Sequence, residues 1–388
     1  MEKNTKTHIH KKKASVVYDE MVQDLKKQIH KGKYSCGDRF PSESELARQY
    51  GISRMSVRQG LAHLENQGMV VKVNGKGSFV SHRYLFKNGI KDRKQTKTIG
   101  LIATTLEDPF VAQIHSGVVE ELQNTGYNVC IYSSERNAEQ ESVNIRQCVE
   151  RGCAGLIIFP IWSRTNSKQI EELDNNNGIP LVLVDRTVPG LNVDYVATDN
   201  FRGGMMAVEY LIQMGHRQIG MIKGVSGTAN DDRYRGYCHC LQKYGIEMDE
   251  NIVVTQKYEN LSHEPLEGGQ HEMRYLMDRS SRPTAVFAAN DALAFGAETA
   301  ALQMGLKVPD DVSIIGFDNF LQAQLAPVPL TTISQPTTEI GHAAAKLILE
   351  NIKAVKIGPK MRVQQVQFIP QLVIRQSVKD LNHNPIDS

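Results

Sequence analysis

The sequence lacks the features of several large classes of protein. No apolar run approaches the roughly 18 residues of a membrane-spanning helix, and the segment 1–13 carries charges but no apolar core of the signal-peptide kind. We therefore expect a cytoplasmic protein with no membrane partner. Aromatic residues make up only 6% of the chain, whereas hydrophobic residues at 40% and charged residues at 23% are ordinary for a globular protein.

Motifs for catalysis and metal binding are also missing. The sequence contains no G-x-S-x-G, no G-x-x-x-x-G-K-[ST] and no H-E-x-x-H. None of the six cysteines forms a C-x-x-C pair, and Cys238 and Cys240 have no partners at zinc-like spacing, so reduced thiols are expected. We therefore expect no enzymatic activity, no cofactor and no metal ion.

Charge is divided unevenly along the 388 residues, a length that predicts two or three domains. Residues 1–97 contain 21 basic and 9 acidic side chains, whereas the remainder contains 24 basic and 34 acidic side chains. A basic amino-terminal part joined to an acidic body indicates that only the first part binds a polyanion. An inert basic tail would account for Lys11 to Lys13 but not for the pattern that follows them.

The stretch 41–80 has the pattern of a winged helix-turn-helix. Ser42 and Glu45 fit the capping box S-x-x-E that begins a helix, and Gly51 can supply the left-handed residue that ends it. Ser53 then caps a second helix. Beyond that helix, an Asn-Gly dipeptide between two strand-like runs predicts a hairpin.

The second of these helices is predicted to read DNA. Val57, Leu61 and Leu64 recur at helical spacing and form its buried stripe. Arg54 and Arg58 lie on another face near its amino-terminal end, which a recognition helix presents to base edges in the major groove. Two arginines alone would more often mark a solvated helix face, but their place between a turn and a hairpin favours DNA binding.

Residues 16–80 resemble the DNA-binding domain of the GntR family. The resemblance is carried by Tyr18, Gly32, Gly37 to Glu43, Leu46-Ala47, Ser53-Arg54, Ser56 to Arg58, Leu61, Leu64, Gly68 and Gly75 to Val80. It implies that this head contacts DNA through its second helix, its first helix and the tip of its wing. The residues implied are Glu43, Ser53, Arg54, Ser56, Arg58, Asn74, Gly75, Lys76 and Gly77.

The rest of the chain alternates strands with helices. A disordered basic tail (1–14), the DNA-binding domain (15–80) and a charged linker (81–97) are expected to precede a body at 98–380. Strand-helix alternation over this length predicts an α/β fold with parallel sheets, divided into two lobes. The expected strands are 98–103, 128–133, 155–159, 180–185, 218–223, 285–289 and 313–317.

Polar and aromatic residues directly follow these strands, where open α/β sheets bind their ligands. They lie at 106–110, 160–162, 185–186, 224–228, 290–291 and 318–319. Aromatic, carboxylate, amide and guanidinium groups together suit the ring and hydroxyls of a sugar. At any one position a helix cap is the commoner role, and Asp108 fits such a cap. Trp162, the only tryptophan, has two possible roles: it lines the cleft or shields a sheet edge.

The body resembles the effector domain of the LacI family. The matching segments are Ala154 to Ile158, Val184 to Arg186, Tyr195-Val196, Asp199-Asn200, Gly215 to Ile219, Arg233, Gly236-Tyr237, Pro283 to Asp291, Val312 to Asp318 and Leu330 to Ile333. The resemblance implies a type-I periplasmic-binding-protein-like double lobe, with the chain crossing between lobes near residues 195, 328 and 356. Family members bind sugars, or sometimes purines, between the lobes. The ligand-binding residues expected here are Asp108, Phe110, Trp162, Asp185, Arg186, Arg233, Asn290 and Asp318, with Arg233, Asn290 and Asp318 as the main polar clamp.

A GntR-type head on a LacI-type body resembles the group of arabinose repressors, including the ending Ile369 to Ser377. The resemblance implies a repressor of carbohydrate-utilisation genes that binds operator DNA as a homodimer and responds to a monosaccharide. L-Arabinose is the leading candidate, while other sugars and purines remain open. The alternatives are a sugar-binding module with no DNA-reading role and, least favoured, an enzyme of sugar or nucleotide metabolism.

Overall fold

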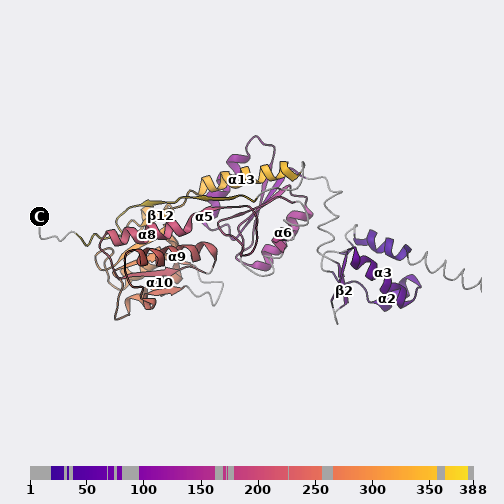
Figure 1. Ribbon diagram of the computed structural model, residues 1–388, viewed down its shortest axis with the longest axis horizontal. Helices are drawn as coiled ribbons and strands as arrows, with labels where there is room; N and C mark the ends of the chain where they lie inside the picture. The colour runs from indigo at the N-terminus through magenta and orange to yellow at the C-terminus, as the bar shows by residue number, and fades with distance from the viewer. Residues whose placement is uncertain are drawn as a thin grey trace, which may run out of the picture. The chain divides into compact units, whose positions relative to one another are not determined.

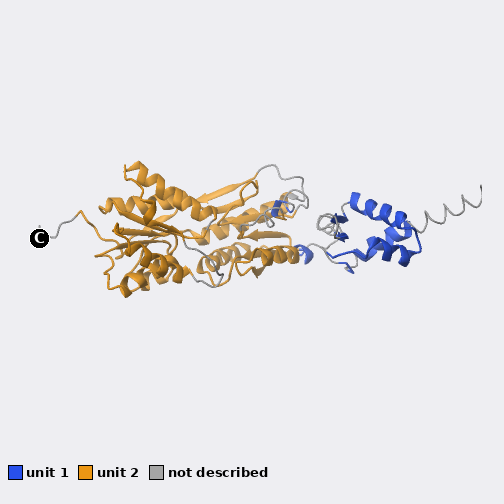
Figure 2. Cartoon of the chain, turned by 90° about the horizontal axis from the view of Figure 1, so that it is seen from below, with its two compact units in different colours: residues 1–96, 149–152, 170–178 blue, residues 97–148, 153–169, 179–388 orange. Residues whose placement is uncertain are grey.

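The computed structural model describes residues 19–29, 33–34, 38–67, 69–73, 77–80, 96–161, 169–171, 173, 179–225, 227–255, 265–355 and 363–382. The chain divides into two compact units (Figure 2). One unit holds residues 1–96, 149–152 and 170–178, and the other holds residues 97–148, 153–169 and 179–388. We call the part of the chain up to Thr96 the head, and the part from Lys97 onward the body. The expected tail (1–14) and nearly all of the expected linker (81–97) lie outside the described residues.

The head has the predicted order of helix, turn, helix and hairpin. After a helix over residues 19–29 come α2 (Glu43–Tyr50), α3 (Arg54–Asn66) and the antiparallel strands β1 (Val70–Val73) and β2 (Gly77–Val80). Ser42 and Glu45 form the predicted capping box: the backbone N–H of Ser42 donates to Glu45 Oε2 at 2.7 Å, and the backbone N–H of Glu45 donates to Ser42 Oγ at 3.3 Å. Gly51 ends α2 with φ of 64°, as expected.

One small core holds the head together. Helical spacing brings one apolar stripe of each helix onto the inner face of the hairpin, and Val57, Leu61 and Leu64 are buried as predicted. The buried core consists of Met21, Val22, Leu25, Ile29, Phe40, Leu46, Val57, Leu61, Leu64, Met69, Val70 and Val80. Since these side chains use the inner faces of α2 and α3, the polar residues of both helices remain on the outside.

The body contains two six-stranded sheets, each with its own core (Figure 1). The amino-terminal lobe has the strand order β13-β7-β6-β5-β3-β4. Its strands are β3 (Thr98–Ala103), β4 (Asn128–Ser133), β5 (Gly155–Ile158), β6 (Leu181–Val184), β7 (Tyr195–Thr198) and β13 (Gln365–Phe368), and its helices are α5 (Pro109–Leu122), α6 (Ala138–Glu150) and α13 (Thr337–Val355).

The carboxyl-terminal lobe has the strand order β14-β12-β11-β10-β8-β9, and β14 pairs antiparallel with β12. Its strands are β8 (Ile219–Lys223), β9 (Val253–Thr255), β10 (Ala285–Ala288), β11 (Ser313–Asp318), β12 (Thr331–Ser334) and β14 (Gln371–Val373). Its helices are α8 (Asn200–Gln213), α9 (Thr228–Lys243), η1 (Glu250–Ile252), α10 (Pro265–Met277), α11 (Asp291–Gln303) and α12 (Gln322–Leu325). The other strand pairs of both sheets are parallel.

The chain passes between the two sheets three times, each time directly after a strand. The passages are 198–200, from β7 to α8, then 334–337, from β12 to α13, and 368–371, from β13 to β14. The crossings expected near 195, 328 and 356 precede these positions: residue 195 begins β7, residue 328 precedes β12, and residue 356 lies outside the described residues. The passages fall later than expected because β7, β12 and β13 each complete their pairing before the chain leaves the sheet.

Glycines let the helices of each lobe pack very closely. A Cβ on Gly204 of α8 would lie 2.3 Å from the carbonyl oxygen of Arg233 in α9, and a Cβ on Gly236 would lie 2.2 Å from that of Phe201. The pairs α5 with α13 and α10 with α11 meet through glycines in the same way. Close packing of α8 against α9 fixes the position of Arg233. Within the described ranges, no helix has both the length and the apolar character needed to cross a membrane.

Candidate DNA-binding and effector sites

The amino-terminal end of α3 presents two exposed arginines. Ser53 caps this end by accepting a hydrogen bond from the backbone N–H of Ser56 at 3.1 Å, and the two hydroxyls lie 2.9 Å apart. Arg54 and Arg58 project from the first turns of the helix and are both exposed. Four of the expected DNA-binding residues therefore lie together at one helix end.

Glu43 joins this group from α2. Its carboxylate accepts two hydrogen bonds from the guanidinium of Arg58, from Nε at 3.2 Å and from NH2 at 3.0 Å. Lys72 Nζ of the hairpin lies 3.7 Å from the same carboxylate. The hydrogen bond from Arg58 lowers the pKa of Glu43, while burial acts in the opposite direction. This carboxylate is therefore anionic at neutral pH. The pairing orients Arg58 while its side chain stays 63% exposed.

The wing is only partly described. Asn74, Gly75 and Lys76 lie outside the described residues, whereas Gly77 begins β2 with φ of 112°. A Cβ on Gly77 would lie 3.1 Å from Nε of Arg39. Arg39, which was not among the expected DNA-binding residues, therefore packs at the base of the wing.

Arg233 is the centre of the candidate effector site in the body. It extends from α9, is only 5% exposed, and its guanidinium carbon lies 3.7 Å from the centre of the Phe317 ring. Its Nε donates to Asn200 Oδ1 at 2.8 Å, and NH1 donates to the carbonyl oxygen of Ala289 at 2.6 Å. Burial lowers the pKa of Arg233, and the Asp318 carboxylate opposes that change.

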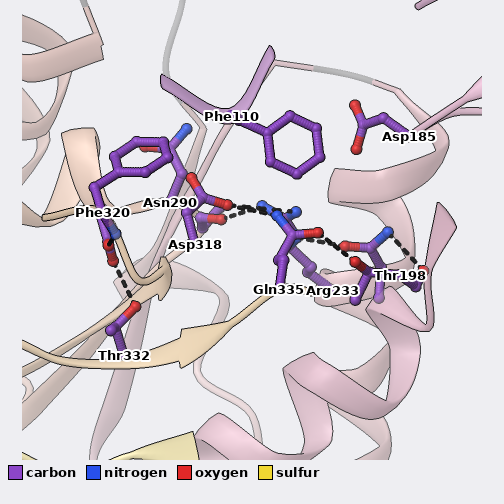
Figure 3. Close-up of polar contacts among 12 residues, drawn as sticks. Phe110, Asp185, Thr198, Arg233, Asn290, Asp318, Phe320, Thr332 and Gln335 are labelled. Atoms are coloured by element: carbon purple, nitrogen blue, oxygen red, sulfur yellow. Dashed lines mark hydrogen bonds and ion pairs between the residues drawn. The ribbon is translucent and has the colours of Figure 1, made fainter. Parts of the chain in front are cut away.

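Asp318 and Asn290, which the family resemblance groups with Arg233 as a polar clamp, lie beside Arg233 in Figure 3. Asp318 ends β11 with a φ of 123°, and its Oδ1 lies 4.0 Å from NH2 of Arg233. Burial raises the pKa of Asp318 well above its usual range, although the nearby guanidinium acts in the opposite direction. Asn290 has the cap role that is common after a strand: its Oδ1 accepts the backbone N–H of Leu293 at 2.8 Å and so begins α11.

The amino-terminal lobe contributes a second group of expected residues. Asp108 caps α5 by accepting the backbone N–H of Phe110 at 3.0 Å, and the Phe110 side chain is nearly buried. Asp185 has a φ of 71° and its carboxylate pairs with Nε of Arg186 at 2.9 Å. Burial chiefly raises the pKa of Asp108, and the carboxylate of Asp185 adds to this effect.

Residues from the two lobes come together at this place. Figure 3 shows Phe110 and Asp185 next to Arg233, Asn290 and Asp318. The electrostatic contacts agree, because the charges of Asp185 and Arg186 act on Arg233, and that of Asp108 acts on Asp318. Trp162, expected near them, lies outside the described residues.

Two polar residues at this site, Gln335 and Asp291, were not among the expected ligand-binding residues, although the sequence placed Asp291 directly after an expected strand. Gln335 donates through Nε2 to Asp318 Oδ1 at 2.6 Å, and it follows β12 directly. Gln335 could have been predicted from the rule that ligands of open α/β sheets bind beside the carboxyl ends of strands. Asp291 is fully buried and accepts the backbone N–H of Phe320 at 2.8 Å and the hydroxyl of Thr332 at 2.5 Å, so it fixes the loop after Asp318. Burial raises the pKa of Asp291 to about 7.

The site therefore offers carboxylates, guanidinium groups, an amide and one aromatic ring to a small polar molecule. In the part of the chain that the structure describes, no three His, Cys, Asp or Glu side chains are grouped so as to hold a metal ion. Such groups can form hydrogen bonds with hydroxyls, and the Phe110 ring can contact the face of a sugar ring.

Two sequence families match different parts of the chain. Residues 17–80 match the gntR family of bacterial regulatory proteins, and residues 208–378 match the periplasmic binding protein-like domain. The arabinose metabolism transcriptional repressor of Geobacillus stearothermophilus is 30% identical over 373 residues, which cover 96% of this chain and 100% of that protein. The HTH-type transcriptional repressor PurR of Yersinia enterocolitica is 33% identical over 344 residues, 87% of this chain and 96% of that protein.

Solved structures resemble the body. A LacI family transcriptional regulator from Enterococcus faecium, crystallised with bound ribose, is 28% identical and has a TM-score of 0.61, covering 73% of this chain and 99% of that one. The match supports the double-lobed architecture and agrees with the parallel sheets described above.

Proposed function

The chain belongs to the family of bacterial transcriptional repressors that join a GntR-type head to a periplasmic-binding-protein-like body, and we propose that it represses carbohydrate-utilisation genes until a sugar binds in its body. It is a sugar-responsive regulator and not an enzyme. We place its action in the bacterial cytoplasm, where two copies bind the two half-sites of a pseudo-palindromic operator. The head at 15–80 and the body at 98–380 act as separate binding domains, joined by the linker at 81–97.

One observation above all supports operator binding: Arg54 and Arg58 are exposed at the capped amino-terminal end of α3. Such a helix end fits the major groove, where arginine recognises guanine by two hydrogen bonds. Glu43, Ser53 and Ser56 lie beside these arginines, and Asn74 to Gly77 would reach the DNA backbone or the minor groove from the wing.

A gel-shift experiment with DNA from upstream of the gene, at two salt concentrations, tests the head. Binding should weaken steeply as salt rises, because basic side chains release counterions from the phosphates. The rival reading, a sugar-binding module with no DNA-reading role, would be supported if the full chain retained no upstream fragment at either salt concentration.

We propose that the effector contacts Arg233, Asn290 and Asp318 on one side and Asp108, Phe110, Asp185 and Arg186 on the other. L-Arabinose is the leading candidate because the relative from Geobacillus is named for arabinose metabolism. The relative with bound ribose supports a pentose more broadly, and PurR keeps a purine among the alternatives.

A thermal-shift screen of the full chain against pentoses, hexoses and purines tests the effector. A ligand at a hundred times its dissociation constant stabilises the native state by about 2.7 kcal/mol. The same ligand should release operator DNA from the wild type, whereas Asp318→Ala should bind operator normally and lose the response. A normal sugar response in Asp318→Ala would place the effector elsewhere.

A further inference from the structure

Five residues, of which Thr198, Asn200, Arg233 and Gln335 are buried and Asp318 is partly buried, form a closed ring of polar contacts beside the candidate effector site (Figure 3). Thr198 Oγ1 donates to Gln335 Oε1 at 2.5 Å, and Gln335 Nε2 donates to Asp318 Oδ1 at 2.6 Å. Asp318 faces Arg233 at 4.0 Å, and Arg233 Nε donates to Asn200 Oδ1 at 2.8 Å. Asn200 Nδ2 closes the ring by donating to the carbonyl oxygen of Thr198 at 3.1 Å. We call these five residues the polar ring.

The polar ring joins two of the three passages between the lobes. Thr198 and Asn200 begin and end the passage from β7 to α8, and Gln335 lies in the passage from β12 to α13. The third passage is attached to the first, because the backbone N–H of Asp199 donates to the carbonyl oxygen of Phe368 at 2.8 Å. The polar ring therefore connects the places about which the lobes would turn.

Each member of the polar ring depends on the others for its hydrogen bonds. Thr198, Asn200, Arg233 and Gln335 are at most 6% exposed, so water has little access to replace a lost partner. A buried polar group that loses its partner is costly, and networks of this kind respond as a unit. The two ends of the Gln335 amide are both used, which fixes the orientation of this side chain between Thr198 and Asp318.

We propose that Gln335 is a positioning residue that transmits effector binding at Asp318 and Arg233 to the passages between the lobes. A polyol that donates a hydroxyl to the Asp318 carboxylate competes with the Gln335 amide for the same oxygen. Release of that amide changes its bond to Thr198, and with it the geometry of both passages. This inference rests on the proposed sugar response, and it assigns the transmission of that response to one side chain of the body.

The first test needs no sugar. Hydrogen exchange of the full-length protein is compared for wild type, Gln335→Met and Thr198→Val, which keep side-chain size but remove one ring contact each. Amides of residues 199–203 and 337–340 should exchange at least about tenfold faster in both variants, because local opening there becomes easier. Asn144→Leu is the control: its buried amide donates to the carbonyl oxygen of Ser133 and to Ser134 Oγ, away from the passages. The control should leave the rates at 199–203 and 337–340 unchanged.

The second test uses L-arabinose and D-ribose as probes. The ratio of operator dissociation constants with and without saturating sugar is measured for each variant. Wild type should fall in the roughly 5- to 150-fold range of allosteric coupling, and Gln335→Met below about threefold. The sugar dissociation constant of Gln335→Met should stay within about fivefold of wild type, a split that a loss of folding would not produce.

The two tests separate the possible failures. If neither sugar changes operator binding by wild type, the proposed effectors are wrong, and the exchange experiment still decides whether the polar ring joins the passages. If the amides of residues 199–203 and 337–340 exchanged at the wild-type rate in both Gln335→Met and Thr198→Val, the inference would be overturned. Full coupling in Gln335→Met accompanied by a large loss of sugar affinity would also overturn it, because Gln335 would then be a ligand contact.

Discussion

One arginine–carboxylate pair lies in the head and another lies in the body, and the two pairs differ in their exposure to solvent. In the head, Arg58 pairs with Glu43 at 3.0 Å, and the arginine side chain is 63% exposed. In the body, Arg233 faces Asp318 at 4.0 Å, and the two side chains are 6% and 9% exposed. The exposed pair can open toward a phosphate or a base, whereas the buried pair is held by neighbours on every side.

This difference explains how the same side chain can have two uses. Solvent screens the exposed pair, so exchanging the Glu43 carboxylate for DNA disturbs the fold of the head very little. Arg233 is removed from water, and Asn200, the Ala289 carbonyl, the Phe317 ring and Asp318 compensate for that loss. In the head the arginine is therefore available to contact DNA, whereas in the body the arginine also stabilises the fold.

Replacing the buried arginine should have the largest effect. Arg233→Met keeps much of the volume but leaves the Asn200 amide oxygen and the Asp318 carboxylate without their partner. Breaking a buried charge pair from one side costs about 3–5 kcal/mol, and we expect that loss in the stability of the body. Urea unfolding followed by the fluorescence of Trp162, the single tryptophan, measures it.

The head supplies the internal control for that experiment. Exchange rates of amides in α2 and α3 should be unchanged in Arg233→Met. If the body lost less than about 1 kcal/mol, the contrast between the two arginines would be wrong, because Arg233 would then be as replaceable as a surface residue.

The exposed arginine should show the opposite behaviour. Arg58→Ala should weaken operator binding roughly tenfold to a hundredfold, the scale of one bidentate base contact, without a measurable change in the melting temperature. Arg48→Ala, at an exposed position in the last turn of α2, is the matched control and should bind operator nearly as well as wild type. Equal losses in the two variants would mean that α3 contributes only general positive charge.

Close helix packing gives a third, smaller test of the contrast. Gly204→Ala places a methyl group 2.3 Å from the carbonyl oxygen of Arg233, so α8 and α9 must separate. Overpacking of this kind costs about 1–3 kcal/mol, and it should also weaken sugar binding by displacing Arg233. Calorimetric titration with sugar measures the second effect, and unchanged affinity would show that the position of α9 is not critical for the site.

The head was predictable because its signals are local. The capping box, the left-handed Gly51 and the apolar stripe of α3 each depend on residues within one or two turns. Seven of the twelve strands described in the body were also predictable: among them, β3, β4 and β11 lie within one residue of their expected ends, since buried parallel strands are short apolar runs.

The contacts of the effector site were less predictable, because they join residues far apart in sequence. Asp318 was found by its place after a strand, but Arg233 lies inside a helix and emerged only through family resemblance. Gln335 follows a strand that was not among those considered, and its partner Thr198 is 137 positions away. The passages were misplaced for the same reason: pairing with a distant strand decides where β7, β12 and β13 end.

The smallest expected effect is a difference in pH dependence between the two parts. Burial raises the pKa of Asp291 to about 7, despite opposing hydrogen bonds and the charge of Arg375. At this carboxyl the folded state therefore binds more protons than the unfolded chain between pH about 4 and about 7, so the contribution of Asp291 to stability should fall as pH rises through that window. Asp318 acts in the same direction, whereas burial lowers the pKa of His216 and opposes the trend near pH 6.

The contribution of Glu43 to stability depends on pH in the opposite way. Its pKa is lowered by Arg58, so the head should lose stability only as the medium becomes acidic. Urea unfolding of wild type and Asp291→Asn at pH 4.5, 5.5 and 7 decides the matter: the slope with pH should be smaller in Asp291→Asn, and an unchanged slope would assign it to other groups.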